Sequence, residues 1–303
     1  MSLLALWLVL ASAALHVFWN TLVKQCADKL SFAWLTTVAG IPVLLPPFLL
    51  WRLVSPRGAD CLANPEVWLW AAVSGLLETA YIACLFGAYA AADLSAVYPL
   101  SRGAAPLFTL LLAGAFVGDG ATPLQAAGVA VVVAGTLLVG VSSWRGGGAP
   151  NISRKGLALS LATGCAIAGY HLADRKAMSL SPAPDPLDYL FLMHLFMSLF
   201  MTLWAWRKRP SWAALASSWL GAPWRGGRRA VMLVALFTPL SYFLIVLALR
   251  EGNVIHITAA RNVGILFSTL VGVFWLRERV SPARTFGSAL IMAGLAGMAL
   301  TRG

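Results

Sequence analysis

Charged residues are the scarcest class in this sequence. Only 11% of its 303 residues are charged, whereas soluble domains usually carry about 25%, so a soluble globular protein is excluded. Asp and Glu together number 11 against 22 Lys and Arg, and the net charge is +11. With 60% hydrophobic residues and a mean hydropathy of +0.80, the chain reads as a polytopic membrane protein. Its basic loop residues are expected to meet anionic lipid headgroups rather than nucleic acid.

Motifs for catalysis, metals and cofactors are also missing. The four cysteines have no metal-ligand or redox spacing and do not support a disulfide framework: Cys26, Cys61, Cys84 and Cys165. No glycine-rich phosphate loop, nucleophile elbow or His-rich metal motif occurs. We therefore expect no enzyme activity, no cofactor and no metal site, and ATP-driven pumping would need a separate subunit.

Long apolar runs fill the chain. A bilayer-spanning helix needs about 20 apolar residues, and runs of that kind leave no room for a large soluble domain. The first run lacks a basic segment before it, so we interpret it as a membrane helix and not as a cleaved signal. The sequence predicts ten transmembrane helices at about 3–23, 31–53, 67–91, 94–117, 123–143, 156–178, 186–206, 230–249, 252–276 and 281–301.

An internal repeat organises these helices. Residues 102–135 align without a gap on 261–294, and Arg102, Pro123, Gly128 and Gly135 meet identical residues. Each half would hold five helices, and an odd number inserts the second half upside down, as in the inverted repeats of secondary transporters. The predicted fold class is an all-α polytopic membrane protein with two inverted five-helix repeats. We expect a first repeat at 1–145, a glycine-rich linker at 146–155 and a second repeat at 156–303.

Several stretches resemble one transporter family. AYAAADLSAVYPLSRGAAP at 88–106, with FVGDGATPLQAAGVAVVVAGTLLVG after it, resembles the EamA domain of the drug/metabolite transporter superfamily. HVFWNTLVK at 16–24 is similar to an H-x-x-W-N-x-x-x-K pattern of bacterial members, and the segment from 260 to 294 resembles a second EamA domain. The resemblance implies two EamA repeats, a multi-pass protein of the cell inner (plasma) membrane, and transport of small metabolites. The family's usual glutamate after the fourth helix is Asp119 here, a position that we interpret as structural.

Ionisable groups inside predicted spans are candidate site residues because burying them is costly. In the first helix, His16, Trp19 and Asn20 share a face at i, i+3 and i+4. In the third helix, Glu78 and Tyr81 lie about one turn apart near mid-membrane. Glu78 is expected to be either a proton carrier or the partner of an arginine in the fourth helix, Arg102. The structural alternatives are a histidine hydrogen-bonded inside the bundle and an ion pair without a transport role.

The fourth and ninth helices carry the two arginines of the repeat. Tyr98 and Arg102 lie one turn apart, and Pro106 cannot donate to the Arg102 carbonyl, which predicts a bend or local unwinding beside Arg102. The ninth helix offers Arg261 and Asn262 without prolines. A guanidinium offers forked donors suited to a carboxylate or phosphate. The alternatives for both arginines are a lock between the repeats or snorkelling to the surface.

Three further polar residues complete the candidate set of substrate-binding or gating residues. Tyr170 and His171 lie in the sixth helix and Tyr242 lies in the eighth. Asp174 follows His171 by one turn but nears the end of its helix, and His194 is interpreted as a bundle histidine with its hydrogen bonds satisfied. We therefore keep both outside the set.

The sequence favours a secondary transporter. We expect an exporter of small amphipathic or zwitterionic metabolites such as amino acids, working by alternating access, with membrane lipids as neighbours and protons considered as a coupling ion. The alternatives are other metabolites, drugs or sugar phosphates, an integral-membrane enzyme acting on a lipid-linked substrate, or a structural or lipid-flipping subunit. Two signals disagree on the side of the membrane at which the termini lie. With the N-terminus inside, as is common in the family, the cytoplasmic ends hold six of the 22 basic residues and the opposite side fourteen, which favours both termini outside.

Overall fold

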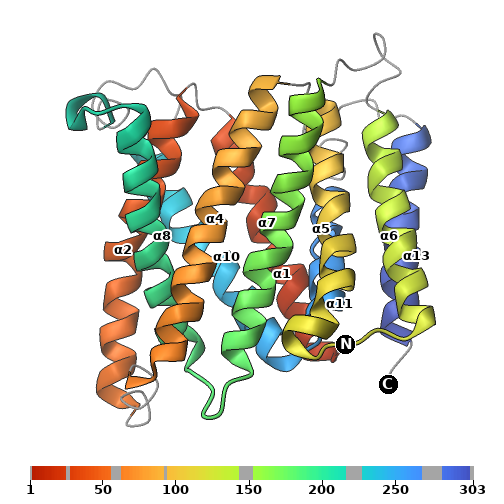
Figure 1. Cartoon of the computed structure of the whole chain (residues 1–303), viewed down its shortest axis with the longest axis horizontal. Helices are drawn as coiled ribbons and strands as arrows, with labels where there is room; N and C mark the ends of the chain where they lie inside the picture. Colours follow the sequence, from red (N-terminus) through yellow and green to blue (C-terminus); the bar gives the residue numbers. More distant parts are fainter. Residues whose placement is uncertain are drawn as a thin grey trace.

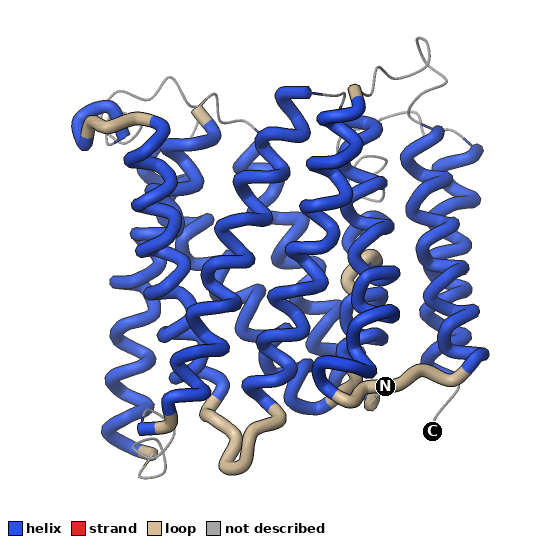
Figure 2. The backbone as a smooth tube through the Cα atoms, in the orientation of Figure 1, coloured by secondary structure: helices blue, strands red, loops and turns tan. Residues whose placement is uncertain are grey.

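The computed structural model describes residues 2–24, 28–55, 63–91, 94–142, 153–215, 227–267 and 282–300. Its main helices, shown in Figure 1, are α1 (Leu3–Lys24), α2 (Lys29–Val54), α4 (Pro65–Ala91), α5 (Leu94–Val117), α6 (Pro123–Ser142), α7 (Arg154–Met178), α8 (Pro186–Lys208), α10 (Gly227–Glu251), α11 (Val254–Ala260) and α13 (Pro282–Leu300). These described residues contain no strand (Figure 2). The predicted all-α fold class is therefore confirmed.

The surface of the helix bundle suits a bilayer. Six described helices are long and apolar enough to cross a membrane, and four shorter apolar helices accompany them. Large apolar side chains such as Trp7, Leu53 and Leu111 are exposed on the outside, whereas polar residues such as His171 and Asp174 are buried. Successive long helices run in opposite directions, and α1 begins at the end where α13 finishes (Figure 1). The chain is a multi-pass membrane protein.

Helix packing follows the inverted repeat. The third helix of the first repeat, α4, packs against α7, and its counterpart α10 packs against α1. The last helices of the repeats, α6 and α13, pack on each other through glycines. A Cβ on Gly135 would lie 2.6 Å from the Gly287 carbonyl oxygen, and one on Gly294 would lie 2.7 Å from that of Gly128. The sequence alignment equates Gly128 with Gly287 and Gly135 with Gly294. The contacts Gly135–Gly287 and Gly128–Gly294 are therefore equivalent to each other, as a pseudo-twofold axis between the repeats requires.

Of the bend or local unwinding predicted beside Arg102, the unwinding is wrong. Helix α5 runs without interruption through that residue. The break lies in the second repeat instead, where α11 ends at Ala260 and a turn at 261–262 precedes the helical residues 263–267. The Asn262 side-chain amide donates to the Arg102 carbonyl at 3.3 Å. The carbonyl that Pro106 leaves without a helical donor therefore has a partner from the other repeat, and α5 stays helical.

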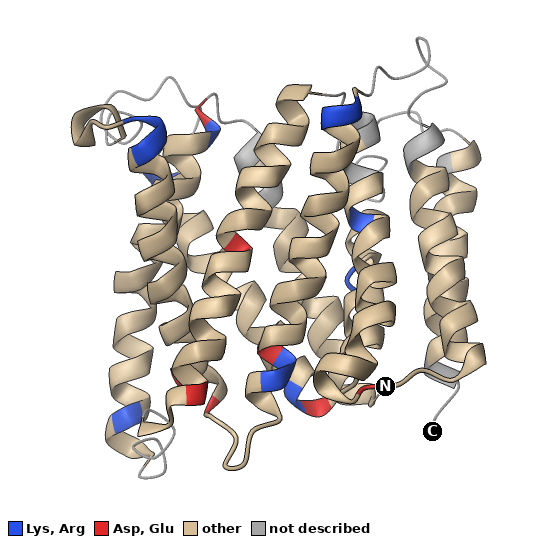
Figure 3. Cartoon of the chain, in the orientation of Figure 1, with Lys and Arg blue, Asp and Glu red and all other residues tan. Residues whose placement is uncertain are grey.

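Charge is distributed unequally between the two ends of the bundle (Figure 3). At the end where α1 begins, Arg175 donates to both carboxylate oxygens of Asp119 at 3.1 and 3.2 Å, and the Val254 N–H donates to the same carboxylate at 2.8 Å. Arg52 lies 3.5 Å from Asp188 at this end. Described basic residues are more numerous at the opposite end, and they are Lys29, Arg154, Lys155, Arg207, Lys208, Arg209, Arg228 and Arg229.

Candidate functional site

Each repeat pairs its arginine with a histidine. Arg102 Nη2 on α5 lies 2.8 Å from His16 Nε2 on α1, and Arg261 Nη1 lies 2.6 Å from His171 Nε2 on α7. In both repeats the histidine comes from the first helix and the arginine from the fourth. Since a guanidinium only donates, each Nε2 accepts and each imidazole is neutral in this arrangement. His171 Nδ1 then carries the hydrogen and donates to the Thr258 hydroxyl at 2.7 Å.

Aromatic rings surround Arg261. Its Nη1 lies 3.4 Å from the Tyr170 hydroxyl, and its guanidinium carbon lies 5.6 Å from the centre of the Tyr242 ring. The Tyr170 ring is 5.9 Å from that of Tyr242 and 6.2 Å from that of Tyr81, both edge to face. The structure therefore brings together five predicted site residues, His171 and the following four: Tyr81, Tyr170, Tyr242 and Arg261. Together they form a cationic and aromatic cluster, which we call the Arg261 cluster.

Two predicted residues of the first repeat, Trp19 and Arg102, lie beside His16. The Trp19 ring contacts the His16 ring edge to face at 4.6 Å, and no described residue accepts a hydrogen bond from the buried Trp19 Nε1. Both arginines lie close enough to His16 and His171 to act on each electrostatically, so the two halves of the candidate site are neighbours. The side chains of Asn20 and Tyr98 lie outside the part of the chain that the structure describes.

Asn262 is engaged within the protein. Its amide nitrogen lies 3.3 Å from the Arg102 carbonyl and 3.4 Å from the Thr136 hydroxyl, and the residue is 2% exposed. Asn262 therefore joins the two repeats in this conformation. The sequence analysis considered such a lock for the two arginines, and here the residue next to Arg261 forms it.

Sequence reasoning left out a buried carboxylate, Asp174. It is fully buried and accepts a hydrogen bond from the Tyr189 hydroxyl at 2.7 Å and a second, short one from the Tyr242 hydroxyl. Two hydroxyl donors stabilise a carboxylate that would otherwise be costly to bury. Its position one turn after His171 was the available signal, whereas nothing in the sequence indicated Tyr189.

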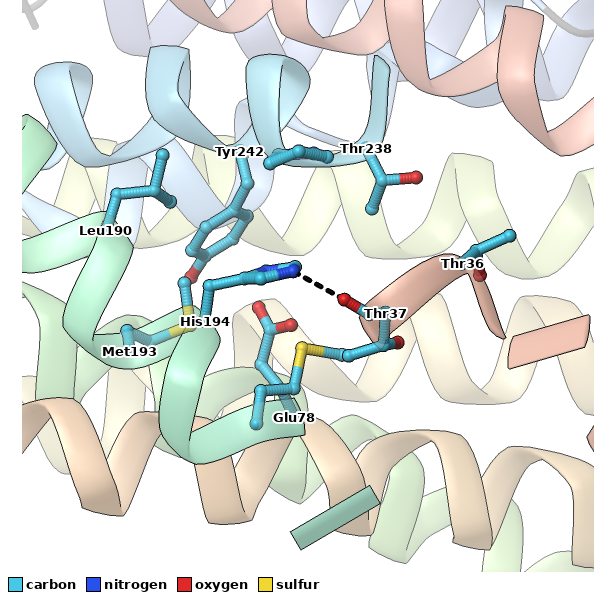
Figure 4. Close-up of a pocket in the computed structure, with 10 residues that line it drawn as sticks. Thr36, Thr37, Glu78, Leu190, Met193, His194, Thr238 and Tyr242 are labelled. Atoms are coloured by element: carbon cyan, nitrogen blue, oxygen red, sulfur yellow. Dashed lines mark hydrogen bonds between the residues drawn. The ribbon is translucent and has the colours of Figure 1, made fainter. Parts of the chain in front are cut away.

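A small cavity lies beside the Arg261 cluster (Figure 4). Its volume is about 40 Å³, and Glu78 and Tyr242 are the predicted site residues that line it, together with Thr36, Thr37, Leu190, Met193, His194, Met197, Thr238 and Pro239. A water needs roughly 10–15 Å³ of such volume, so the cavity has room for a few waters but not for an amino acid. The histidine that lines it is hydrogen-bonded inside the bundle, as expected, because His194 Nε2 lies 2.8 Å from the Thr37 carbonyl.

The interpretation of Glu78 as the partner of Arg102 is wrong. Among the described residues Glu78 forms no hydrogen bond or ion pair, and Arg102 contacts His16. The physical reason is that an imidazole acceptor already lies within hydrogen-bonding distance of the Arg102 guanidinium. Glu78 on α4 is directed at the cavity instead (Figure 4).

Comparisons with known proteins agree with this architecture. The model of the EamA-like transporter family matches residues 3–141 and 154–300, one match for each half of the chain. A solved structure titled only "Crystal structure of protein" is similar at a TM-score of 0.72 and 21% identity, over 98% of this chain and 96% of that one, which is a likeness of fold. No curated protein matches the chain. With both halves matched as EamA repeats, the chain belongs to the EamA-like transporter family, within the drug/metabolite transporter superfamily.

Proposed function

We propose that this transporter exports small amphipathic or zwitterionic metabolites, amino acids being the model class, across the cell inner (plasma) membrane by alternating access. The substrate would bind between the repeats, at the Arg261 cluster and the His16–Arg102 pair. Membrane lipids surround the bundle, no nucleic acid is involved, and a coupling ion supplies the driving force.

The observation that carries this proposal is the surroundings of Arg261. Its guanidinium contacts an imidazole, a phenolic hydroxyl and an aromatic face. No carboxylate of the described residues lies within ion-pair distance of it. A cation inside a membrane bundle needs an anion, and the carboxylate of an amino acid fits the guanidinium fork. The rings of Tyr81, Tyr170 and Tyr242 offer an apolar surface to the side chain of the same substrate.

The small cavity supports a cycle with at least two conformations. At about 40 Å³ it cannot admit an amino acid, so binding requires the helices around it to move. At the end of the bundle where α1 begins, Asp119 bonds to Arg175 of α7 and to the N–H of Val254 at the start of α11. These bonds join the two repeats, so opening this end means breaking them.

Transport by purified protein tests the proposal. Proteoliposomes loaded with a panel of unlabelled amino acids would be assayed for counterflow of the labelled ones, alongside amino alcohols that lack the carboxylate. We expect wild-type protein to transport one or more zwitterions, and Arg261→Gln to lower their kcat/KM by roughly 10- to 150-fold, the range for loss of a charge-assisted hydrogen bond. Amino alcohols should be transported poorly by both proteins and with little difference between them.

Arg250→Gln is the matched control, because Arg250 lies exposed at the end of α10 and should leave kcat/KM unchanged. Transport of zwitterions that survives Arg261→Gln would sink the site assignment. A panel in which no zwitterion exchanges but sugar phosphates do would replace the substrate class.

A further inference from the structure

Glu78 presents an isolated carboxylate near the middle of the bundle. It lies halfway along α4, where Figure 3 shows an acidic residue far from both ends of the helix. It is partly buried, lines the small cavity, and has no hydrogen-bond or ion-pair partner among the described residues. An ionised carboxylate at this depth is strongly disfavoured unless a positive charge or a set of donors accompanies it.

The groups around Glu78 do not supply that charge. Tyr242 of α10 lines the same cavity, but its hydroxyl donates to Asp174 of α7. His194 of α8 lies across the cavity with Nε2 at the Thr37 carbonyl. The other titratable neighbours are Asp174 and Tyr170 of α7, Tyr189 of α8 and Tyr81 of the same helix, and none of them is a cation. Arg261, the nearby cation, forms no ion pair with Glu78.

A second oxygen in the cavity also lacks a partner. The Thr238 hydroxyl of α10 is buried without a hydrogen bond to any described residue, and it lines the cavity with Glu78 (Figure 4). An unsatisfied buried hydroxyl calls for a water or an ion. Two oxygens of this kind in a space of about 40 Å³ fit a small hard cation with its waters, since such cations prefer oxygen ligands.

We propose that the small cavity is a monovalent-cation site, with the Glu78 carboxylate as its charged ligand and the Thr238 hydroxyl as a second oxygen. Glu78 is the one carboxylate among the residues that line the cavity, and a proton or Na⁺ supplies the matching charge of +1. The neighbouring Asp174 does not line the cavity, and its carboxylate accepts hydrogen bonds from Tyr189 and Tyr242. Its use as the coupling ion rests on the proposed transport cycle, in which opening of the cavity would release the cation. Binding itself requires no transport.

Thermal unfolding of the purified full-length chain in detergent tests the site. NaCl would be titrated against choline chloride at constant ionic strength, and pH would be varied separately. A cation that binds only the folded state raises Tm, by about 5 °C at a hundredfold excess over its Kd. We expect either the Na⁺ response or a rise of Tm with falling pH in wild-type protein, and loss of that response in Glu78→Gln.

Two control variants show whether the Tm response depends on the cavity and whether the bound cation is Na⁺ or a proton. Glu66→Gln changes the acid in the first turn of the same helix and should keep the full response. Thr238→Val should weaken a Na⁺ response but leave a proton response intact, because a proton needs only the carboxylate. Equal responses in wild-type protein and Glu78→Gln would overturn the proposal, as would no Na⁺ or pH response in wild-type protein.

A measurement on the wild-type chain covers the case in which Glu78→Gln fails to fold. Dicyclohexylcarbodiimide modifies protonated carboxyl groups in apolar surroundings, and mass spectrometry locates the adduct. We expect labelling at Glu78 that Na⁺ or high pH suppresses, and unmodified Glu78 under all conditions would overturn the site. Cation binding without any transport would instead count against the proposed function alone.

Discussion

The bond between Asn262 and the Arg102 carbonyl makes a specific energetic prediction. Pro106 has no N–H, so that carbonyl lacks its helical donor, and the Asn262 amide lies 3.3 Å from it. Replacing Asn262 by Ala leaves the carbonyl without either partner. Replacing Pro106 by Ala restores a backbone donor on the same helix. The cost of Asn262→Ala should therefore be smaller when position 106 is alanine.

The magnitude follows from the hydrogen bond involved. Leaving a buried acceptor unsatisfied costs about 1–3 kcal/mol, and an ordinary buried hydrogen bond contributes about 1 kcal/mol net. We expect Asn262→Ala to lower the unfolding free energy by about 2 kcal/mol in the wild-type background and by about 1 kcal/mol in Pro106→Ala. The coupling energy of the cycle is then about 1 kcal/mol.

Reversible unfolding in mixed micelles, titrated with a denaturing detergent, measures all four proteins of this double-mutant cycle. The bond that Asn262 makes to Thr136 at 3.4 Å is lost in both backgrounds and cancels. Thr136→Val, which removes that bond and the bond from the Thr136 hydroxyl to the Val132 carbonyl but leaves the Arg102 carbonyl its partner, should show no coupling to Pro106→Ala. An identical cost of Asn262→Ala in both backgrounds would refute the view that Asn262 replaces the missing helical donor.

Three shorter predictions test the packing, the surface and the orientation. Gly135→Ala should lower Tm, because its Cβ would lie 2.6 Å from the Gly287 carbonyl oxygen, whereas Gly114→Ala meets nothing closer than 3.9 Å and should not. Burial opposes ionisation of Asp28, but hydrogen bonds from Arg209 and Ser31 outweigh it and lower its pKa. This contribution to stability is therefore present above the unfolded pKa near 4 and lost as pH falls through the folded pKa, so the stability difference between wild-type protein and Asp28→Asn should shrink in acid. The basic end of the bundle lies opposite the termini and should face the cytoplasm, so the C-terminus should lie outside. Alkaline phosphatase fused to the C-terminus should therefore be active, and GFP fused there should not fluoresce.

Most of the helix architecture follows from hydropathy and length. The expected fourth helix, 94–117, coincides with α5, and most other described ends differ from expectation by three residues or fewer. The repeat was readable because arginine, proline and glycine occupy the same places in both halves. Glycines such as Gly135 are constrained by close backbone approach, and that constraint leaves a signature in sequence. These features depend on local pattern, which a sequence carries directly.

The side-chain partners did not follow in the same way. The sequence allowed Arg102 either an acid or a structural lock, and the structure gives it His16. The sequence placed the helix irregularity beside Pro106 and not at Arg261. Whether a helix tolerates Pro106 depends on a hydrogen-bond donor for the Arg102 carbonyl, and that donor lies about 160 residues away. Asp174 was set aside for its position near a helix end, yet Tyr189 and Tyr242 bury it completely. Such choices are made by tertiary contacts that sequence spacing within one helix does not reveal.

The histidines extend the repeat and show how its two halves diverge. His16 and His171 play the same part towards Arg102 and Arg261, and three residues after each stands Trp19 in one repeat and Asp174 in the other. One half therefore offers an indole where the other holds a carboxylate. In an inverted repeat the two halves exchange roles as the pathway opens to either side. Since their chemistry differs, a substrate would meet unlike surroundings in the two states, and such a difference is what allows its affinity to change between them.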